Sequence, residues 1–358
     1  MAMQSALNDV PEDLRDSTWS YLLAKSDSSI ARVRIGATPA EGAAADPSRP
    51  GVFALADQNR KVTIMNVRTG ERLMEFEPAF STRSEANQYR LAFSPDGQRL
   101  AVAREGPGGI VVHQVRDGAK VKEWATPASV YMEFGDNEKL LRHGAGSLQV
   151  WNSVTGSLLW EDKQSGVIGV LGVFLPGGNE VLKVTLQNRL QVVRASDGGL
   201  VRNLGGRMPT YQWTMLVHPD GQSVYTYTVG GSTECVSLLD GKTLFALPQK
   251  QARGHIGITS DGEQLVTATF KSDGGQLIEV WEARTGNAIR SLLGGQGHPV
   301  NLSVHPRSKE LLISGANTRV WDLTGQLPRW RMQSYHMGRP VFWGSDDQLL
   351  SNAYDSWG

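Results

Sequence analysis

The side chains in this chain best suited to bind a metal or act as nucleophile or base are seven histidines and one cysteine. Cys235 has no second cysteine to pair with, so neither an internal disulfide nor a cysteine-based zinc cluster can form. His218 and His305 each precede a proline in a turn, and His113 lies within a strand-like run. No two histidines have metal-ligand spacing with a carboxylate, so we expect no metal site and no cofactor.

Motifs for nucleophilic or phosphate chemistry are also missing from the sequence. No Gly-x-Ser-x-Gly elbow occurs, and the glycine-rich stretch 294–297 is not followed by Lys-Ser/Thr or a helical pattern. Most aspartates occupy turn positions, where they satisfy backbone groups. A triad assembled from distant loops stays open, because triads are defined by geometry. We expect a protein that is not an enzyme.

Composition excludes several other classes of protein. Lys plus Arg and Asp plus Glu both total 36, so no bulk charge favours nucleic acid or an anionic membrane. No apolar run approaches the length of a membrane span, and residues 1–17 lack the pattern of a signal peptide. With a single cysteine, this predicts a cytoplasmic protein.

Nearly all of these residues lie within a sequence repeat. A first turn rich in Pro, Asp and Gly recurs near residues 96, 136, 177, 220, 261, 307 and 346. A second turn recurs with its glycine at positions 70, 118, 156, 198, 241, 286 and 325. Both series have a period of about 42 residues, and short apolar runs such as 100–103 separate the turns. Four strands in each 40–45 residues indicate an all-β fold, a β-propeller of four-stranded antiparallel blades.

Several motifs resemble those of bacterial WD-repeat proteins. The segment 91–103 is similar to the strand-turn-strand core of that family, and Gly254-His255 and Gly297-His298 are similar to its Gly-His pair. Third-strand endings of the family type occur at Val150-Trp151-Asn152, Val280-Trp281-Glu282 and Val320-Trp321-Asp322. The resemblance implies a hydrogen-bonded set in the last full repeat, formed by His298, Ser314 and Trp321 with Asn317 in place of the usual aspartate. It also implies a protein that holds partners.

A second resemblance bears on the number of blades. The segment 150–160 is also similar to the tryptophan-docking repeat of quinoprotein-type propellers, which often have eight blades. Seven repeats contain both turns, at about 37–77, 89–124, 129–162, 168–205, 210–247, 254–293 and 298–332.

Residues at the two ends of the chain predict an eighth blade. Residues 338–358 together with residues 18–35 would supply two strands each and leave no exposed sheet edge. Residues 1–17 would then be an N-terminal extension, and 18–358 a single propeller domain. Seven blades, with residues 30–36 as the first strand of the first blade, is the alternative. Residues 37–50 are rich in Ala, Gly and Pro and suit either an innermost strand or a loop.

The expected partner surface is the face where loops join consecutive blades and join second to third strands. Basic residues outnumber acidic ones on these loops, and aromatic residues near the starts of innermost strands could ring the channel mouth. Packing inside the channel is the alternative role for the aromatic residues. The predicted partner-binding residues are Arg83, Arg142, Arg189, Arg207, Arg253, Lys271, Arg339, Tyr89, Tyr131, Tyr211, Trp213 and Trp343.

These features predict a non-catalytic scaffold that binds an acidic or extended partner protein or peptide at the channel mouth. An enzyme or small-ligand-binding propeller with a site at the same mouth is one alternative. A structural subunit of a larger assembly is another.

Overall fold

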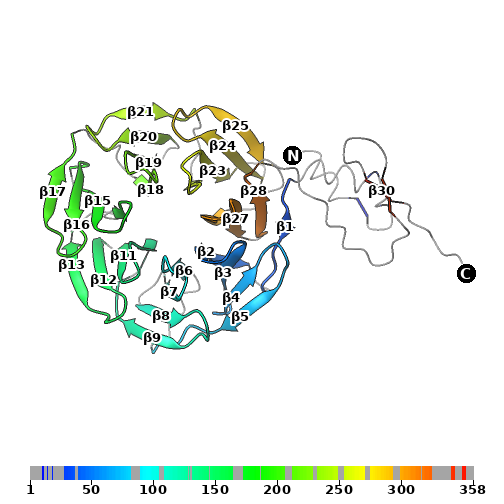
Figure 1. The fold of residues 1–358 in the computed structure, drawn as a ribbon, viewed down its shortest axis with the longest axis horizontal. Coiled ribbons are helices and arrows are strands. Elements are labelled where there is room, and N and C mark those ends of the chain that lie inside the picture. Colours follow the sequence, from blue (N-terminus) through cyan, green and yellow to red (C-terminus); the bar gives the residue numbers. More distant parts are fainter. Residues whose placement is uncertain are drawn as a thin grey trace, which may run out of the picture. The chain divides into compact units, whose positions relative to one another are not determined.

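The fold is a ring of seven four-stranded antiparallel sheets, the blades, in a computed structural model of the chain (Figure 1). The chain divides into two compact units, Met1–Gln326 with the ring and Leu327–Gly358. The structure describes residues 10, 11, 14, 18, 28–36, 39–81, 89–104, 109–127, 129, 131–144, 146–163, 172–185, 187–205, 212–228, 232–248, 254–270, 275–292, 299–315, 317–324, 340–342 and 349–351.

Each blade runs from an innermost to an outermost strand. Blade one is β2 (Ala40–Ala45), β3 (Val52–Asp57), β4 (Val62–Asn66) and β5 (Arg72–Phe76), and blade two is β6 (Tyr89–Phe93), β7 (Arg99–Arg104), β8 (Ile110–Gln114) and β9 (Lys120–Trp124). Blade three is β10 (Tyr131–Phe134), β11 (Lys139–Gly144), β12 (Ser147–Asn152) and β13 (Leu158–Lys163), and blade four is β14 (Gly172–Phe174), β15 (Glu180–Val184), β16 (Leu190–Arg194) and β17 (Leu200–Asn203).

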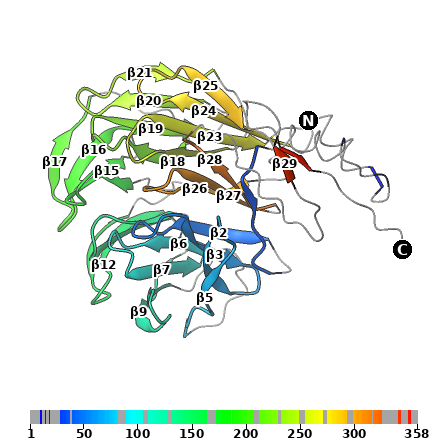
Figure 2. The same cartoon turned by 45° about the vertical axis from the view of Figure 1, so that its right-hand side comes forward.

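The remaining blades follow the same order. Blade five is β18 (Gln212–Val217), β19 (Ser223–Thr228), β20 (Thr233–Ser237) and β21 (Thr243–Ala246), and blade six is β22 (Gly254–Ile258), β23 (Gln264–Phe270), β24 (Gln276–Glu282) and β25 (Ala288–Leu292). Blade seven is β26 (Pro299–Val304), β27 (Glu310–Gly315), β28 (Arg319–Asp322) and β1 (Ala31–Arg32). Figure 2 shows blade one (β2, β3 and β5) next to blade seven (β26 and β27).

The ring closes through β1, not through an eighth blade. Ala31 pairs with Val320 and Arg32 with Arg319, so β1 is the outermost strand of blade seven. The prediction of eight blades is therefore wrong, because one N-terminal strand already covers the open edge of β28. The alternative number, seven, is confirmed, but residues 30–36 do not form the first strand of blade one. That strand is β2, within the stretch 37–50.

The second unit contains one hairpin among its described residues. Its strands, β29 (Pro340–Phe342) and β30 (Leu349–Ser351), pair with each other as a two-stranded sheet. We expected these two strands to share a blade with residues 18–35. Within that range, Ala31 and Arg32 pair with blade seven instead.

Local turn chemistry explains the strand pairs. The second-turn glycines at 70, 118, 156, 198, 241 and 286 all have φ between 70° and 75°. Each turn is followed by a register shift between the third and fourth strands, as between Val150 and Trp151 of blade three. A glycine in the left-handed region before a β-bulge is the usual connection of this kind. These turns therefore fix the pairing of the two outer strands.

The core lies between blades, because each sheet buries both faces against its neighbours. One apolar cluster joins blades four and five through residues such as Leu182, Val192 and Val224. The small residues of β2 follow from this packing, since a Cβ on Gly42 would lie 2.5 Å from the carbonyl oxygen of Tyr89. The outermost strands are more exposed, and all four residues of β17 face solvent.

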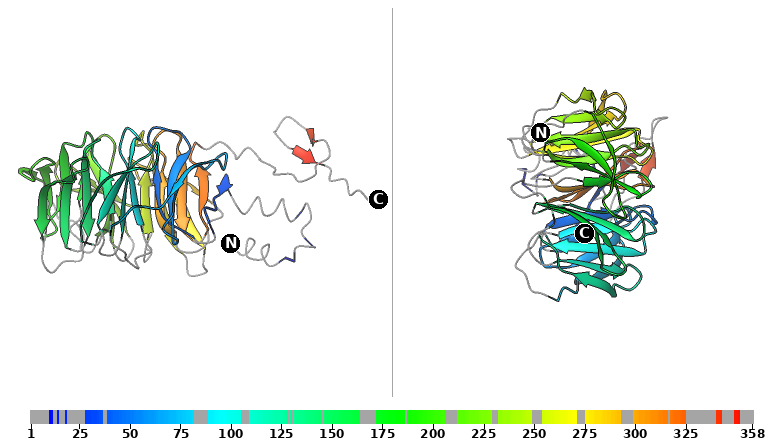
Figure 3. Two further views of the ribbon diagram at one scale, coloured as in Figure 1. Left: turned by 90° about the horizontal axis from the view of Figure 1, so that it is seen from below. Right: turned by 90° about the vertical axis from the view of Figure 1, so that its left-hand side faces the viewer.

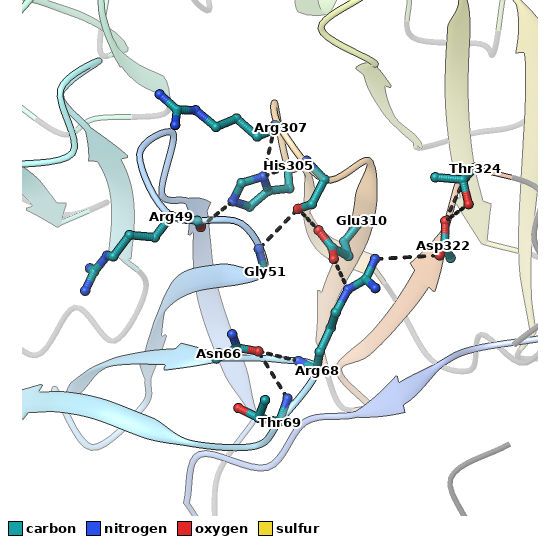
Figure 4. A network of polar contacts seen from close by, with 11 residues as sticks. Arg49, Gly51, Asn66, Arg68, Thr69, His305, Arg307, Glu310, Asp322 and Thr324 are labelled. Atoms are coloured by element: carbon teal, nitrogen blue, oxygen red, sulfur yellow. Dashed lines mark hydrogen bonds and ion pairs between the residues drawn. The ribbon is translucent and has the colours of Figure 1, made fainter. Parts of the chain in front are cut away.

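Polar contacts join blade seven to blade one (Figure 4). The guanidinium of Arg68, in the second turn of blade one, pairs with Glu310 and lies 3.6 Å from Asp322, both of blade seven. His305 contacts the carbonyl oxygen of Arg49 through Nε2 at 2.9 Å. The seam where the two ends of the ring meet is thus held by an ion-pair network as well as by β1.

Candidate interaction face

The ring has two faces, because the strands run between them (Figure 3). The loop face is where the second strand of each blade ends, for example at Arg104 and Gly144. The turn face carries both turn series, for example Gly97 and Gly118. The predicted partner-binding residues were expected on the loop face.

Tyr131 and Glu133 form a polar pair at the loop-face end of the innermost strand β10. The Tyr131 hydroxyl donates a hydrogen bond to Oε2 of Glu133 at 2.8 Å. The backbone N–H of Phe174, in blade four, donates to Oε1 at 2.5 Å. Burial raises the pKa of Glu133 to about 7, and these two hydrogen bonds oppose that rise. Glu133 is therefore a carboxyl that titrates near neutral pH and links two blades.

His143 lies beside this pair. Its ring stacks on Tyr131, with 5.0 Å between the ring centroids and 19° between the planes. Burial lowers the pKa of His143 to about 3, and the positive charges of Arg142 and Arg90 lower it further. The Nδ1 atom of His143 is buried and has no hydrogen-bond partner among the described residues. His143 lies in β11, whose ladder to β12 extends to Gly144.

Positive charge from blade two reaches the histidines of two other blades. His255, on the innermost strand β22 of blade six, donates Nε2–H to the carbonyl oxygen of Pro299 at 3.1 Å. Burial lowers the pKa of His255 to about 4, and Arg90 on the innermost strand β6 contributes to this as it does at His143. The charge of Arg90 in blade two thus acts on a histidine of blade three and on a histidine of blade six.

Arg142 lies within strand β11, not in a loop. Its side chain is fully buried, and Nη1 donates to Ser147 Oγ at 2.7 Å while Nη2 donates to the carbonyl oxygen of Gly144 at 2.7 Å. Burial lowers its pKa to about 10. The expected loop position is therefore wrong for Arg142, since a buried guanidinium with these hydrogen bonds stabilises the end of its own hairpin.

Tyr89 and Arg189 differ in exposure. Tyr89 begins β6 and is only 1% exposed, within the core between blades one and two. Arg189 is exposed in the loop between β15 and β16, where the backbone N–H donates to Thr185 Oγ1 at 3.2 Å. Arg189 is thus available on the loop face, whereas Tyr89 is covered.

The other predicted partner-binding residues are not placed. Trp213 belongs to β18, but its side chain is outside the described residues. The residues outside the described part of the chain are Arg83, Arg207, Arg253, Lys271, Arg339, Tyr211 and Trp343.

The family-type hydrogen bond occurs in a different blade from the one expected. In blade six, the Trp281 indole donates to Thr267 Oγ1 at 3.0 Å. In blade seven, the buried Ser314 hydroxyl has no partner among the described residues, and Asn317 is exposed. The set expected around Trp321 is therefore wrong for Ser314, while the part expected of Asn317 stays a prediction because His298 lies outside the described residues.

The histidines of the first turns, His218 and His305, form contacts between blades that the sequence did not indicate. The turn positions of His218 and His305 are confirmed, since Nδ1 of each accepts a backbone N–H two residues later, at 3.1 Å in both. In addition, Nε2 of His218 contacts the carbonyl oxygen of Gly262 in blade six at 3.0 Å. A histidine in this turn thus joins its blade to the next, which serine at the same position, Ser94, is too short to do.

Three further observations concern chemistry at the described residues. No group of three or more His, Cys, Asp or Glu side chains there could hold a metal ion. Cys235 is buried, and burial raises the pKa of its thiol. Within the described part of the chain, no helix is long and apolar enough to cross a membrane.

Comparison with known proteins supports the fold. No family model and no curated protein matches the sequence. Among solved structures, the ring is similar to the β-propeller domain of Cps50 (Swd1) from Myceliophteria thermophila, with a TM-score of 0.67 and 14% sequence identity. The match covers 82% of this chain and 99% of that chain. The chain therefore has a seven-bladed β-propeller fold, and neither eight blades nor a quinoprotein-type propeller is supported.

Proposed function

Starting from a closed WD40-like ring, we propose that the protein is a non-catalytic scaffold that binds an acidic or extended partner protein or peptide on the loop face, at the channel mouth. The observation that carries the proposal is the convergence of Arg90, His143 and His255 from three blades, with the positive charge of Arg90 acting on both histidines. A positive potential at the mouth of a channel favours an acidic partner.

Rigidity of the ring supports this role. Hydrogen bonds cross the seams between blades, for example from the Trp160 indole to the Ala195 carbonyl at 3.0 Å and from the Tyr225 hydroxyl to the Ala283 carbonyl at 2.7 Å. A rigid frame that displays loops binds with a smaller loss of conformational entropy than a flexible one. Propellers of this type serve mostly in protein interactions, and the match to Cps50 (Swd1) is consistent with that use.

The test is affinity capture from the native host with the whole chain as bait, followed by mass spectrometry. A variant with Arg207, Arg253 and Lys271 changed to alanine should lose the captured partner. The matched control is Arg194→Ala on the turn face, which should retain it. Equal capture by both variants would overturn the loop-face site, and turnover of a small molecule by the purified protein would overturn the scaffold role. A cytoplasmic location stays a prediction, which fractionation of the host would test.

A further inference from the structure

A cavity of about 400 Å³ lies between blades one and two on the turn face, away from the proposed loop-face site. Its apolar wall is formed by Ile64, Met74 and Val115. The polar side chains that line it are Ser48, Arg49, Asp96, Gln98, Gln114 and Arg116. The volume is within the range of pockets that bind ligands or side chains of a partner.

Equivalent positions at other seams show what fills such a space. Ala195, Ala283, Leu323 and Val115 each follow the third strand of a blade and donate a backbone N–H to the first turn of that blade. Val67, Ser153 and Leu238 hold the same position in the other blades, and in three of these seven cases a described residue of the preceding blade donates a hydrogen bond to the carbonyl of the same residue. The donors are Trp160 to Ala195 at 3.0 Å, Tyr225 to Ala283 at 2.7 Å and Arg290 to Leu323 at 2.8 Å.

The seam between blades one and two has no such donor among the described residues. Met74 occupies the position of Trp160 and Arg290, four residues after the second-turn glycine. Its sulfur lies 3.5 Å from where a Cβ on Gly118 would be, just as the indole of Trp160 lies 3.0 Å from that of Gly198. A thioether cannot donate a hydrogen bond, so the Val115 carbonyl receives none from the described residues. The cavity thus borders Val115, whose counterpart Ala195 receives the Trp160 indole two seams further on, between blades three and four.

The arginine at the rim of the cavity favours a ligand that carries an acidic side chain beside its aromatic ring. Arg68 and Arg284 occupy the same second-turn position as Arg116, and each pairs with a carboxylate of the preceding blade. For Arg68 these acids are Glu310 and Asp322, which pair with each other in the sheet register.

Arg116 belongs to blade two and has no such acid in the described part of blade one, the preceding blade. The register of blade one places Val52 and Asn66 at the positions of Glu310 and Asp322. The acid of the first turn, Asp46, is fully buried and already binds Arg49 at 2.7 Å. Among the described residues, Arg116 pairs only with its sequence neighbour Asp117 at 3.2 Å, and its side chain is 82% exposed.

We propose that this cavity is a second interaction site, which binds a short acidic peptide segment of a partner through a tryptophan. The indole enters between blades one and two and donates its N–H to the Val115 carbonyl, as Trp160 does to Ala195 within the ring. A carboxylate next to the tryptophan pairs with Arg116. An aromatic anchor in an apolar pocket with an arginine beside it is the usual composition of a binding hot spot.

The test uses fluorescence anisotropy with the whole chain and a fluorescein-labelled peptide in which glutamates flank one tryptophan, Gly-Gly-Glu-Trp-Glu-Gly-Gly. Saturable binding is expected below about 1 mM. Changing Arg116 to glutamate should weaken it about tenfold or more, and Met74→Trp should abolish it by filling the cavity. Arg194→Glu is the matched control, because Arg194 is exposed on the same face and pairs only locally with Asp197 among the described residues.

Two results of these binding measurements would contradict the proposed site. Binding that is unchanged by Met74→Trp, or equal for a peptide with alanine in place of tryptophan, would overturn the cavity. No saturable binding by the unaltered chain would overturn the site as a whole. Since Arg116 is exposed, its variant folds even where the Met74 variant does not, which melting temperature would show. The loop-face variant with Arg207, Arg253 and Lys271 changed should still bind the peptide, so failure here is distinguishable from failure of the proposed scaffold role.

Discussion

Replacing Glu133 with glutamine should remove a pH dependence from the stability of the ring. Burial raises the pKa of this carboxyl from 4.5 to about 7, so the folded protein retains a proton that the unfolded chain releases. The stability that Glu133 contributes is therefore fully present below pH 4.5, the unfolded value, and is lost as the pH rises through 7. The hydrogen bonds from Tyr131 and Phe174 at 2.8 and 2.5 Å place this effect at the contact between blades three and four.

The size of the effect follows from the two pKa values. A rise from 4.5 to about 7 is worth about 3 kcal/mol in all, of which about 2.5 kcal/mol is lost between pH 5 and 8. We would measure the free energy of unfolding in urea by tryptophan fluorescence, and subtract the variant from the wild type at each pH. The subtraction is needed because His143 and His255, with pKa values lowered to about 3 and 4, make stability rise with pH up to about 6.5.

The matched control is Glu75→Gln on the outer strand β5. The hydrogen bond and charge of Lys61 lower the pKa of Glu75 from its usual 4.5, so its difference curve should be nearly flat from pH 5 to 8. A difference between wild type and Glu133→Gln that stays constant over the same range would refute the reasoning. It would mean that Glu133 is ionised in the folded protein throughout.

Two further predictions concern how the ring is held together. Trp160→Phe should lower the free energy of unfolding in urea by about 1–3 kcal/mol, because the Ala195 carbonyl loses its donor. Trp124→Phe should lose no hydrogen bond, since that indole N–H has no partner in the described part of the chain, so equal losses of stability in the two variants would contradict the assignment. Deleting residues 1–36 should expose the edge of β28 and produce aggregates in size-exclusion chromatography with light scattering, whereas deleting residues 327–358 should leave a monomeric ring with an unchanged melting temperature. A stable monomer after the first deletion would show that β1 does not close the ring.

Much of the blade architecture could be predicted from the sequence, because it depends on local chemistry. A glycine such as Gly156 adopts a left-handed conformation wherever the second turn needs one, and the turns recur once per blade. The innermost strand of blade one was less certain, because alanines and Gly42 have weak strand propensity. Its formation depends on close packing against Tyr89, which is distant in sequence.

The candidate site could be predicted only in part. Arg189 lies exposed on its loop as expected, while Arg142 is buried because its guanidinium finds Ser147 and Gly144 within the same hairpin. The composition of a loop gives no information on whether a long side chain turns inward to such partners or outward to solvent. The pairing of Tyr131 with Glu133 was missed, although two polar residues at alternate positions on one strand face the same side.

The sequence by itself determined that the chain forms four-stranded blades, since turn glycines and apolar runs act within about 42 residues. Only the tertiary structure decided that there are seven blades, because closure depends on which distant strand pairs with the edge of β28. That strand is β1. The tertiary structure also decided the chemistry between blades. Nothing in the separate repeats of Met74 and Arg116 marks them as unusual. Only the packing of blade one against blade two places Met74 beside a cavity and leaves Arg116 without a carboxylate of the described part of blade one.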